Sequence, residues 1–218
     1  MAKVISLNVG LPRTVNFQGQ AVTTGIFKEP VKGRIKLRRL NLDGDKQADL
    51  TVHGGPDKAV YAYPAEHYDY WKKQLPNVKL PWGMFGENFT TEGLLEDQVN
   101  IGDIFRVGSS KLVATQPRMP CYKLGVKFGR MDIIRQFMDS KLTGIYFRVL
   151  KEGEVGAGDV IELISKDENN VTVKDIVQLV TDKEDITTLR RAVRIKPLPE
   201  AWRQEFLEQL AQQDDEVE

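Results

Sequence analysis

The chain has 218 residues, which is near the upper end for one domain or suits one domain with a small appendage, and with 41% hydrophobic and 28% charged residues its composition is that of an ordinary soluble globular protein. Lysine and arginine together number 31, and aspartate and glutamate also number 31, so the formal net charge is zero and provides no electrostatic basis for binding a nucleic-acid polymer. A single cysteine excludes an internal disulfide and a cysteine-only metal cage; we also expect no signal peptide, no membrane span and a cytoplasmic location.

From residue 3 to about residue 163, the sequence pattern predicts short strands separated by turns. Alternating and branched residues indicate the strands, while glycine and proline mark the turns between them. The predicted strands include residues 4–9, 33–38 and 58–63, and the predicted helices are 65–75, which Pro76 ends, and 129–141. Many short strands with such turns favour a β-barrel or a strongly bent sheet over alternating strand–helix–strand units.

Two segments of this part, 99–104 and 155–160, resemble each other. Each places Gly-Asp before a predicted strand, which covers 104–107 in one case and 160–164 in the other. A paired ligand site is one interpretation. We prefer the other, in which Gly-Asp is ordinary turn chemistry before a strand.

After Lys166 the pattern becomes helical, and three short helices are predicted within residues 171–213. Thr172 and Asp175 resemble a capping box, Asp185 can cap the second helix, and Pro199 suits the first turn of the third. Helices of about a dozen residues are marginal alone in water, so they should pack on one another, on the strand-rich part or on a second subunit. The predicted domains are therefore 1–166 and 171–213.

The first polar cluster is His53-Gly54-Gly55-Pro56-Asp57-Lys58. Adjacent glycines let the backbone approach a ligand closely and can aim N–H groups at an anion, and Lys58 would supply a charge for phosphate. The alternative, which we favour on this pattern alone, is a polar β-turn with a solvated lysine.

The second polar cluster contains Glu87 and Asn88, flanked by Gly86 and Phe89. Asn88 carries both donors and an acceptor, so it could bind the edge of a heterocycle or orient a substrate. An Asx-type turn closed by Asn88 explains the same spacing equally well.

The third cluster, Thr115-Gln116-Pro117-Arg118-Met119-Pro120-Cys121, holds the only cysteine of the chain. The two prolines make this segment a stiff loop, and Arg118 would favour the thiolate form of Cys121. Cys121 is therefore a candidate nucleophile or soft metal ligand, for which His53 or His67 could be a partner, although we prefer a packing or surface role for His67. A buried structural cysteine is the alternative.

Taken in order, the segments His53–Val60, Gly86–Phe89, Gly102-Asp103 and Gln116–Cys121 resemble the MOSC family, the molybdenum-cofactor sulfurase C-terminal-like domains. The resemblance covers roughly residues 5–164, and the helices that follow resemble the small C-terminal domain of the YiiM-like branch. It implies a mainly β fold with α-helices, namely a MOSC-type β-barrel with peripheral helices plus a small C-terminal three-helix domain.

The resemblance also implies that the chain binds the molybdenum cofactor, a molybdopterin, with Cys121 as the sulfur ligand of the metal, since thiolate suits a soft-ligand centre. Catalytic roles would fall on Cys121, Asn88, His53 and Glu87, the last three orienting the substrate or moving protons. For His53, a turn-forming role remains the alternative. The residues expected to contact the cofactor are Lys28, Asp49, Gly54, Gly55, Lys58, Asn88, Thr115, Gln116, Pro117, Arg118 and Arg148.

The activity implied by the resemblance is reduction of N-hydroxylated compounds, such as hydroxylaminopurine-type bases and hydroxylamines. Electrons would come from a separate donor protein, because the sequence carries no flavin, nicotinamide or iron–sulfur motif. One alternative is a carrier of the cofactor or of its sulfur that performs no turnover, with a persulfide on Cys121. Another is that the helices form a docking or homodimerisation module.

Overall fold

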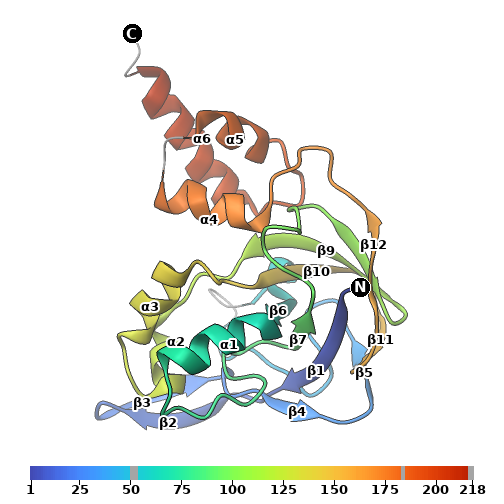
Figure 1. Cartoon of the computed structure of the whole chain (residues 1–218), viewed down its shortest axis with the longest axis vertical. Helices are drawn as coiled ribbons and strands as arrows, with labels where there is room; N and C mark the ends of the chain where they lie inside the picture. The colour runs from blue at the N-terminus through green and yellow to red at the C-terminus, as the bar shows by residue number, and fades with distance from the viewer. Residues whose placement is uncertain (50–53, 183–184, 216–218) are drawn as a thin grey trace.

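A computed structural model describes residues 1–49, 54–182 and 185–215 of the chain. It consists of a strand-rich body with a group of three helices at one end (Figure 1). The strands are β1 (Lys3–Val9), β2 (Arg13–Phe17), β3 (Gln20–Thr24), β4 (Glu29–Val31), β5 (Arg34–Leu37), β6 (Val60–Pro64), β7 (Phe89–Glu92), β8 (Ile104–Val107), β9 (Ser110–Pro117), β10 (Ile145–Lys151), β11 (Gly153–Gly156) and β12 (Ile161–Ser165). The helices are α1 (Ala65–Gln74), α2 (Tyr122–Phe128), α3 (Ile133–Ser140), α4 (Val173–Thr181), α5 (Ile186–Ala192) and α6 (Glu200–Asp215), with a short 3-10 helix, η1 (Pro56–Lys58).

The mainly β class with added helices is confirmed, but the predicted barrel is a curved, open sheet. Over the described residues, the main sheet has eight strands in the order β12-β8-β9-β10-β6-β7-β1-β4, and only β6 and β7 run parallel. No ladder joins β12 to β4 within that part of the chain. Instead the sheet bends until the start of β1 meets the start of β12, through a bridge between Lys3 and Val160 and a 2.8 Å hydrogen bond from Ile161 N to Ala2 O.

The three C-terminal helices share one hydrophobic core with the sheet. Ile176 of α4 and Phe206 of α6 belong to the same buried cluster as Phe147 of β10. Backbone hydrogen bonds extend this contact, since Ile101 N donates to Val171 O over 2.9 Å. Because apolar burial is the main favourable term in folding, the helices and the sheet are expected to stabilise each other.

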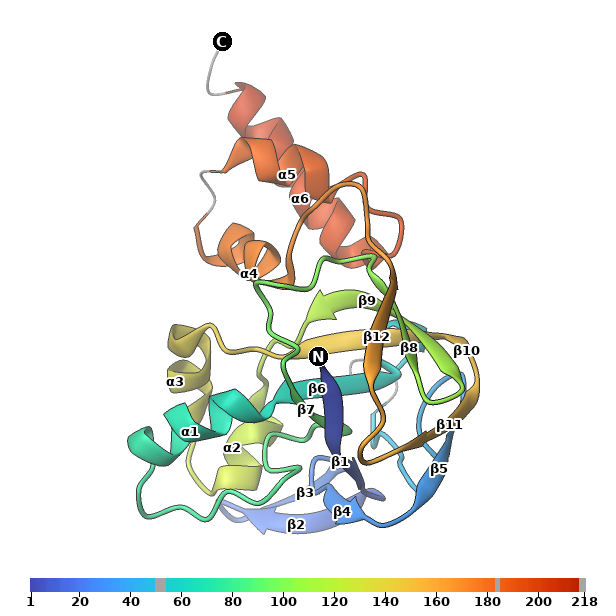
Figure 2. The same cartoon turned by 45° about the vertical axis from the view of Figure 1, so that its right-hand side comes forward.

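A second core lies where α1, α2 and α3 gather on one side of the sheet (Figure 2). It is built from aromatic rings, with Tyr63 of β6 stacked on Phe85 at a centroid distance of 4.6 Å. The rings of Trp71 of α1 and Phe137 of α3 are nearly parallel, with an interplanar angle of 10° and centroids 6.0 Å apart. This aromatic core fixes β6 and α3, and both elements carry residues that surround Arg118.

The helix boundaries show which local signals were sufficient. The helix predicted over 65–75 is α1, and both predicted caps in the C-terminal part are confirmed: Thr172 forms a capping box with Asp175, and Asp185 accepts from Thr188 N. The helix predicted over 129–141 was wrong at its start. Gly129 has a φ of 70° and ends α2, a helix that the sequence analysis did not predict.

The repeated Gly-Asp segments are turns, as we preferred. Gly102 and Gly158 adopt φ values of 97° and 92°, in the left-handed region that favours glycine. Asp103 accepts from Asn100 N over 2.9 Å, and Asp159 accepts from Gly156 N over 2.8 Å. Neither segment forms a wall of the hollows described below. No helix of the described residues has both the length and the apolar character that crossing a bilayer requires.

Candidate functional site

Cys121 lies at the junction of two hollows on the molecule. It follows the end of β9 and is the N-cap residue of α2, in an extended conformation with φ −129° and ψ 173°. Its side chain is half-buried. We call the first hollow the cationic pocket, lined by Thr24, Gly25, Ile26, Lys28, Lys46, Gln47, Ala48, Tyr61, Phe85, Gly86, Arg118, Met119, Cys121, Lys123 and Tyr146. The second is the outer groove, lined by Lys58, Gln116, Pro117, Met119, Pro120, Cys121, Tyr146 and Trp202.

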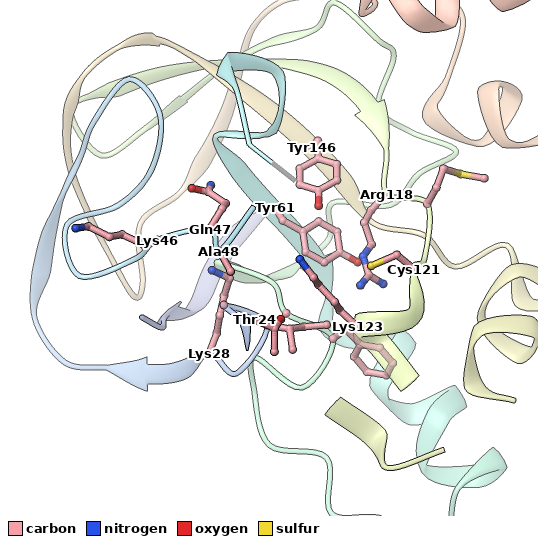
Figure 3. A pocket seen from close by; sticks show the side chains of 15 residues that line it. Thr24, Lys28, Lys46, Gln47, Ala48, Tyr61, Arg118, Cys121, Lys123 and Tyr146 are labelled. Carbon is pink, nitrogen blue, oxygen red and sulfur yellow. Dashed lines mark hydrogen bonds between the residues drawn. The ribbon is translucent and has the colours of Figure 1, made fainter. Parts of the chain in front are cut away.

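The cationic pocket is suited to an anion. It encloses about 590 Å³, including the part open to solvent. Its described walls carry four cationic side chains and no carboxylate. Figure 3 shows Arg118 close to the Cys121 thiol, Lys46 on the far side of the pocket, and Lys123 between Lys46 and the thiol. Clustered cations in a partly enclosed site attract and orient negative groups more strongly than they would in open water.

Arg118 provides the most specific feature of this pocket. It is 5% exposed, and its guanidinium carbon lies 5.4 Å from the Tyr61 ring centroid and 5.1 Å from that of Phe137. Burial acts to lower the pKa of Arg118, but Tyr61, Tyr146 and Cys121 around it outweigh this effect and raise the pKa. Its Nη1 is buried and has no hydrogen-bond partner among the described residues. A buried donor left unpaired is costly, so an anionic oxygen bound here would satisfy it.

Lys28 is largely neutralised by a carboxylate behind it. It forms an ion pair with Asp45, and both side chains are almost fully buried. Burial lowers the pKa of Lys28, while the pairing with Asp45 opposes that shift. Asp45 is itself fixed, because Gly10 N donates to it over 2.9 Å and Asn88 Nδ2 does so over 2.9 Å. Lys28 therefore contributes a positioned donor more than a net charge.

Asn88 has its amide engaged with the protein itself. Its Oδ1 accepts from Tyr61 N over 3.1 Å, and its Nδ2 donates to Asp45. The side chain is 4% exposed and forms part of neither hollow. This geometry ties β6 to the chain around Asp45 and holds Tyr61 in place beside Arg118.

Glu87 is also turned into the protein. Its carboxylate accepts hydrogen bonds from the Tyr68 hydroxyl, from Gly83 N over 2.7 Å and from Phe85 N over 3.1 Å. Burial raises the pKa of Glu87, although these hydrogen bonds act in the opposite direction. The contacts are those of a carboxylate that stabilises the turn at 83–87. Glu87 lines neither hollow.

The first polar cluster is only partly described, since His53 lies outside the described residues. Asp57, within η1, accepts a hydrogen bond from Arg148 of β10, with 2.6 Å between Arg148 Nε and Asp57 Oδ1. Thr115 of β9 donates its hydroxyl to Asp57 O over 2.7 Å. Arg148 and Thr115 thus anchor η1, and Lys58 at its end lines the outer groove.

The predicted site residues that the structure describes, all but His53, therefore fall into three groups. Lys28, Arg118 and Cys121 line the cationic pocket, while Lys58, Gln116, Pro117 and again Cys121 line the outer groove. The described residues that line neither are Asp49, Gly54, Gly55, Glu87, Asn88, Thr115 and Arg148. Their roles toward a cofactor or substrate stay predictions.

Most residues that line the cationic pocket are not predicted from the sequence, among them Lys123, Tyr61 and Tyr146. Lys123 belongs to α2, which was not predicted, although its position two residues after Cys121 was a usable signal. Tyr61 lies in the strand predicted over 58–63, but nothing local shows which way its side chain points. Tyr146 lies opposite Gln116 in the β9–β10 ladder, a register that the sequence alone does not reveal.

The donor set fits a metal that brings ligands of its own. Within residues 1–49, 54–182 and 185–215, no three His, Cys, Asp or Glu side chains come together as a metal site. Cys121 can offer one thiolate, a soft donor, beside cations that suit an anionic ligand. A molybdenum–pterin cofactor, with sulfur ligands and a phosphate of its own, has matching chemistry.

Comparison with known proteins identifies the family of this chain. The profile of the MOSC domain matches residues 49–162, and that of the "YiiM-like, 3-alpha helix domain" matches residues 171–213. "Uncharacterized protein YflK" of Bacillus subtilis is 42% identical over 94% of this chain and 92% of its own length. "Protein YiiM" of Escherichia coli is 41% identical over 70% of this chain and 68% of its own.

Two further similarities bear on fold and activity. A protein named "Reductase" from Gibberella moniliformis is 31% identical over 68% of this chain, which corresponds to 27% of that longer protein. The crystal structure of YiiM from Geobacillus stearothermophilus superposes with a TM-score of 0.80 at 30% identity, covering 96% of this chain and 100% of that one. The similarity therefore extends over the sheet and the C-terminal helices together.

Proposed function

Because this chain belongs to the MOSC family, with a YiiM-like three-helix domain after the sheet, we propose that it binds the molybdenum cofactor through Cys121 and reduces N-hydroxylated compounds. The observation that carries this proposal is the buried Nη1 of Arg118, which has no hydrogen-bond partner in the part of the chain that the structure describes and lies in a cationic pocket that also holds the only thiol. A family associated with this cofactor and a distant relative named as a reductase support it.

In this proposal, Cys121 is the protein's ligand to the metal. Its place after Pro120, at the start of α2, fixes where the sulfur points, because the proline limits the backbone that precedes it. The Tyr146 hydroxyl belongs to the same wall, and burial raises the pKa of Tyr146, so the phenol keeps its proton near neutral pH. It can therefore donate a hydrogen bond next to the thiolate.

The anionic part of the cofactor would be held by Arg118, Lys123 and Lys28. A guanidinium binds phosphate and carboxylate through two parallel hydrogen bonds. The contacts of Arg118 with the Tyr61 and Phe137 rings fix the orientation of its guanidinium. Lys28 is held by Asp45 across the pocket from Arg118 (Figure 3), which limits the orientations that a bound anion can adopt.

When bound, the molybdenum cofactor supplies two-electron redox chemistry, by which an N-hydroxylated amine, two electrons and two protons yield the amine and water. A separate donor protein would deliver the electrons, since the sequence carries no second redox motif. The chain's own residues bind, orient and partly shield the reactants from water.

The alternative function is a carrier of the cofactor or its sulfur. The same thiol and cations would serve a carrier, so the site by itself does not distinguish the two. The relative named as a reductase favours turnover.

The experiment that tests the proposal is purification from a molybdenum-replete host, followed by assays of metal, of pterin and of reduction of 6-N-hydroxylaminopurine with an artificial electron donor. Bound cofactor with turnover is the expected result. Bound cofactor without turnover would favour the carrier, and absence of cofactor under these conditions would overturn both.

A further inference from the structure

We propose that the outer groove binds the planar ring of the substrate and that Trp202, from the three-helix domain, is the surface on which this ring stacks. This inference rests on the proposed function. It assigns a binding role to the C-terminal domain, beyond packing against the sheet.

The outer groove adjoins the cationic pocket at the thiol. Met119, Cys121 and Tyr146 line both hollows. A molecule in the groove therefore reaches the Cys121 side chain without entering the pocket that holds the cations. The groove encloses about 660 Å³, including the part open to solvent, which is ample for a purine-sized ring.

Trp202 is held in place before any ligand arrives. Its indole Nε1 donates to Gln116 Oε1 over 2.8 Å, and Gln116 is 4% exposed at the end of β9. Its ring packs on the fully buried Phe206, with centroids 5.7 Å apart. The side chain remains only half-buried, and it lines the groove. A ring fixed at its edge and against one neighbour loses little freedom when another ring stacks on it.

The chemistry of the groove walls favours a flat heterocycle. Trp202 and Tyr146 are aromatic, while Pro117, Met119 and Pro120 add rigid or polarisable apolar surface. Lys58 and Gln116 supply polar groups to the same walls, and the described walls contain no carboxylate. Every nucleobase offers a π-face for stacking, whereas hydroxylamine itself offers none.

The competing explanation is that Trp202 only joins the two parts of the chain through Gln116. The two roles can be separated, because Trp202→Phe keeps an aromatic ring and loses the indole N–H, whereas Trp202→Leu loses both. Leu207→Ala changes an exposed apolar residue of the same helix and serves as the matched control.

The first test is calorimetric titration of 6-N-hydroxylaminopurine into the purified full chain, a measurement that needs no turnover. We expect binding to weaken about tenfold in Trp202→Leu, as loss of one stacking contact implies, and to stay within about threefold in Trp202→Phe and Leu207→Ala. Equal affinities in wild type and a folded Trp202→Leu, or no binding to wild type, would overturn the inference.

A second measurement compares the tryptophan emission of wild type with that of Trp202→Phe, which keeps an aromatic side chain. The base is expected to quench tryptophan emission in wild type and to leave that of Trp202→Phe unchanged, because Trp71 and Trp82 lie outside the groove. Equal quenching in both proteins would contradict stacking on Trp202.

Turnover then separates this inference from the proposed function. In Trp202→Leu, we expect KM for the purine to rise about tenfold and the kinetics with hydroxylamine to be unchanged. Equal losses for both substrates would assign Trp202 a purely structural role. Binding of the base by a wild type without cofactor or turnover would overturn the proposed reductase while leaving the groove assignment intact.

Discussion

The ammonium of Lys28 and the carboxylate of Asp45 form an ion pair behind the cationic pocket, with 9% and 1% of their side-chain surfaces exposed. Asp45 also accepts hydrogen bonds from Gly10 and Asn88, so a single carboxylate holds three separate segments together. Such a pair gives little net stability over an apolar replacement, but removal of one partner is costly because a buried charge is left alone.

We therefore expect Asp45→Asn to lower the free energy of unfolding by about 3–5 kcal/mol, measured by urea denaturation at pH 7. The matched control is Asp43→Asn, which removes an exposed partner of Arg38 two positions away and should leave the urea midpoint close to wild type. Equal midpoints for the two variants would show that the buried pair does not hold the pocket wall.

Cys121→Ala should abolish molybdenum binding and reductase activity while changing the free energy of unfolding by no more than about 1 kcal/mol. The side chain is half-buried. The segment predicted as a stiff loop is in part strand, because β9 extends to Pro117, and Pro117 and Pro120 restrict the backbone on either side of Arg118. Metal analysis measures the bound molybdenum, and a thermal melt of the same sample measures the stability. Tyr122→Ala alters the exposed neighbour and should retain the metal. A parallel loss of fold and activity would return Cys121 to a structural role.

Arg118→Gln should weaken retention of the cofactor about ten- to a hundredfold, because hydrogen bonds to a charged group contribute about 1.5–3 kcal/mol each. The quantity to measure is oxidised pterin per chain after exhaustive dialysis. Arg106→Gln neutralises an exposed arginine of β8 that pairs with Glu162, and it should keep its pterin. If both variants lost pterin equally, the effect would be one of overall charge and not of the buried guanidinium.

The parts of the structure that were predicted correctly depend on neighbours in the sequence. The caps at Thr172 and Asp185 act within one helical turn, and the strand at 104–107 is preceded by a Gly-Asp turn. Arg118 and Cys121 could be grouped because they lie in one stiff segment. Local chemistry determines such features, so a single sequence carries them.

The parts that were not predicted depend on contacts between distant segments. Trp202 and Gln116 are 86 positions apart, and only the packed helices bring the indole to the groove. Glu87 and Asn88 stood out as polar residues beside glycine. The local pattern did not show that both would turn back to hydrogen-bond the protein itself.

Lys127 should make stability depend on pH. Burial lowers the pKa of Lys127 to about 8, and its ammonium lies 5.0 Å from the Phe27 ring centroid. Since the unfolded chain keeps this proton up to about pH 10.5, unfolding takes up a proton between about pH 8 and 10.5, and stability rises with pH over that window. Partial exposure discounts the effect to about 1 kcal/mol between pH 8 and 9.5.

Urea midpoints at these two pH values measure that rise, and Lys127→Met should remove it. Lys111→Met, a change at an exposed lysine of β9, should keep the wild-type slope. The interval stops below pH 10 because burial raises the pKa values of Tyr61 and Tyr63, and those groups would act in the opposite direction above it. An unchanged slope in Lys127→Met would assign the pH dependence to other groups.

Gly144 and Gly129 share a φ of 70°, so alanine at either position carries the same backbone cost of about 1–2 kcal/mol. They differ in surroundings. An added Cβ at Gly144 would lie 2.5 Å from Ala62 O and 2.7 Å from Tyr61 Cε2, whereas at Gly129 it would meet nothing within 4 Å. Gly144→Ala should therefore cost about 1–3 kcal/mol more than Gly129→Ala in urea denaturation, and by displacing the Tyr61 ring it should also lower pterin retention. Equal losses would mean that β6 and β10 can separate without disturbing the wall that holds Arg118.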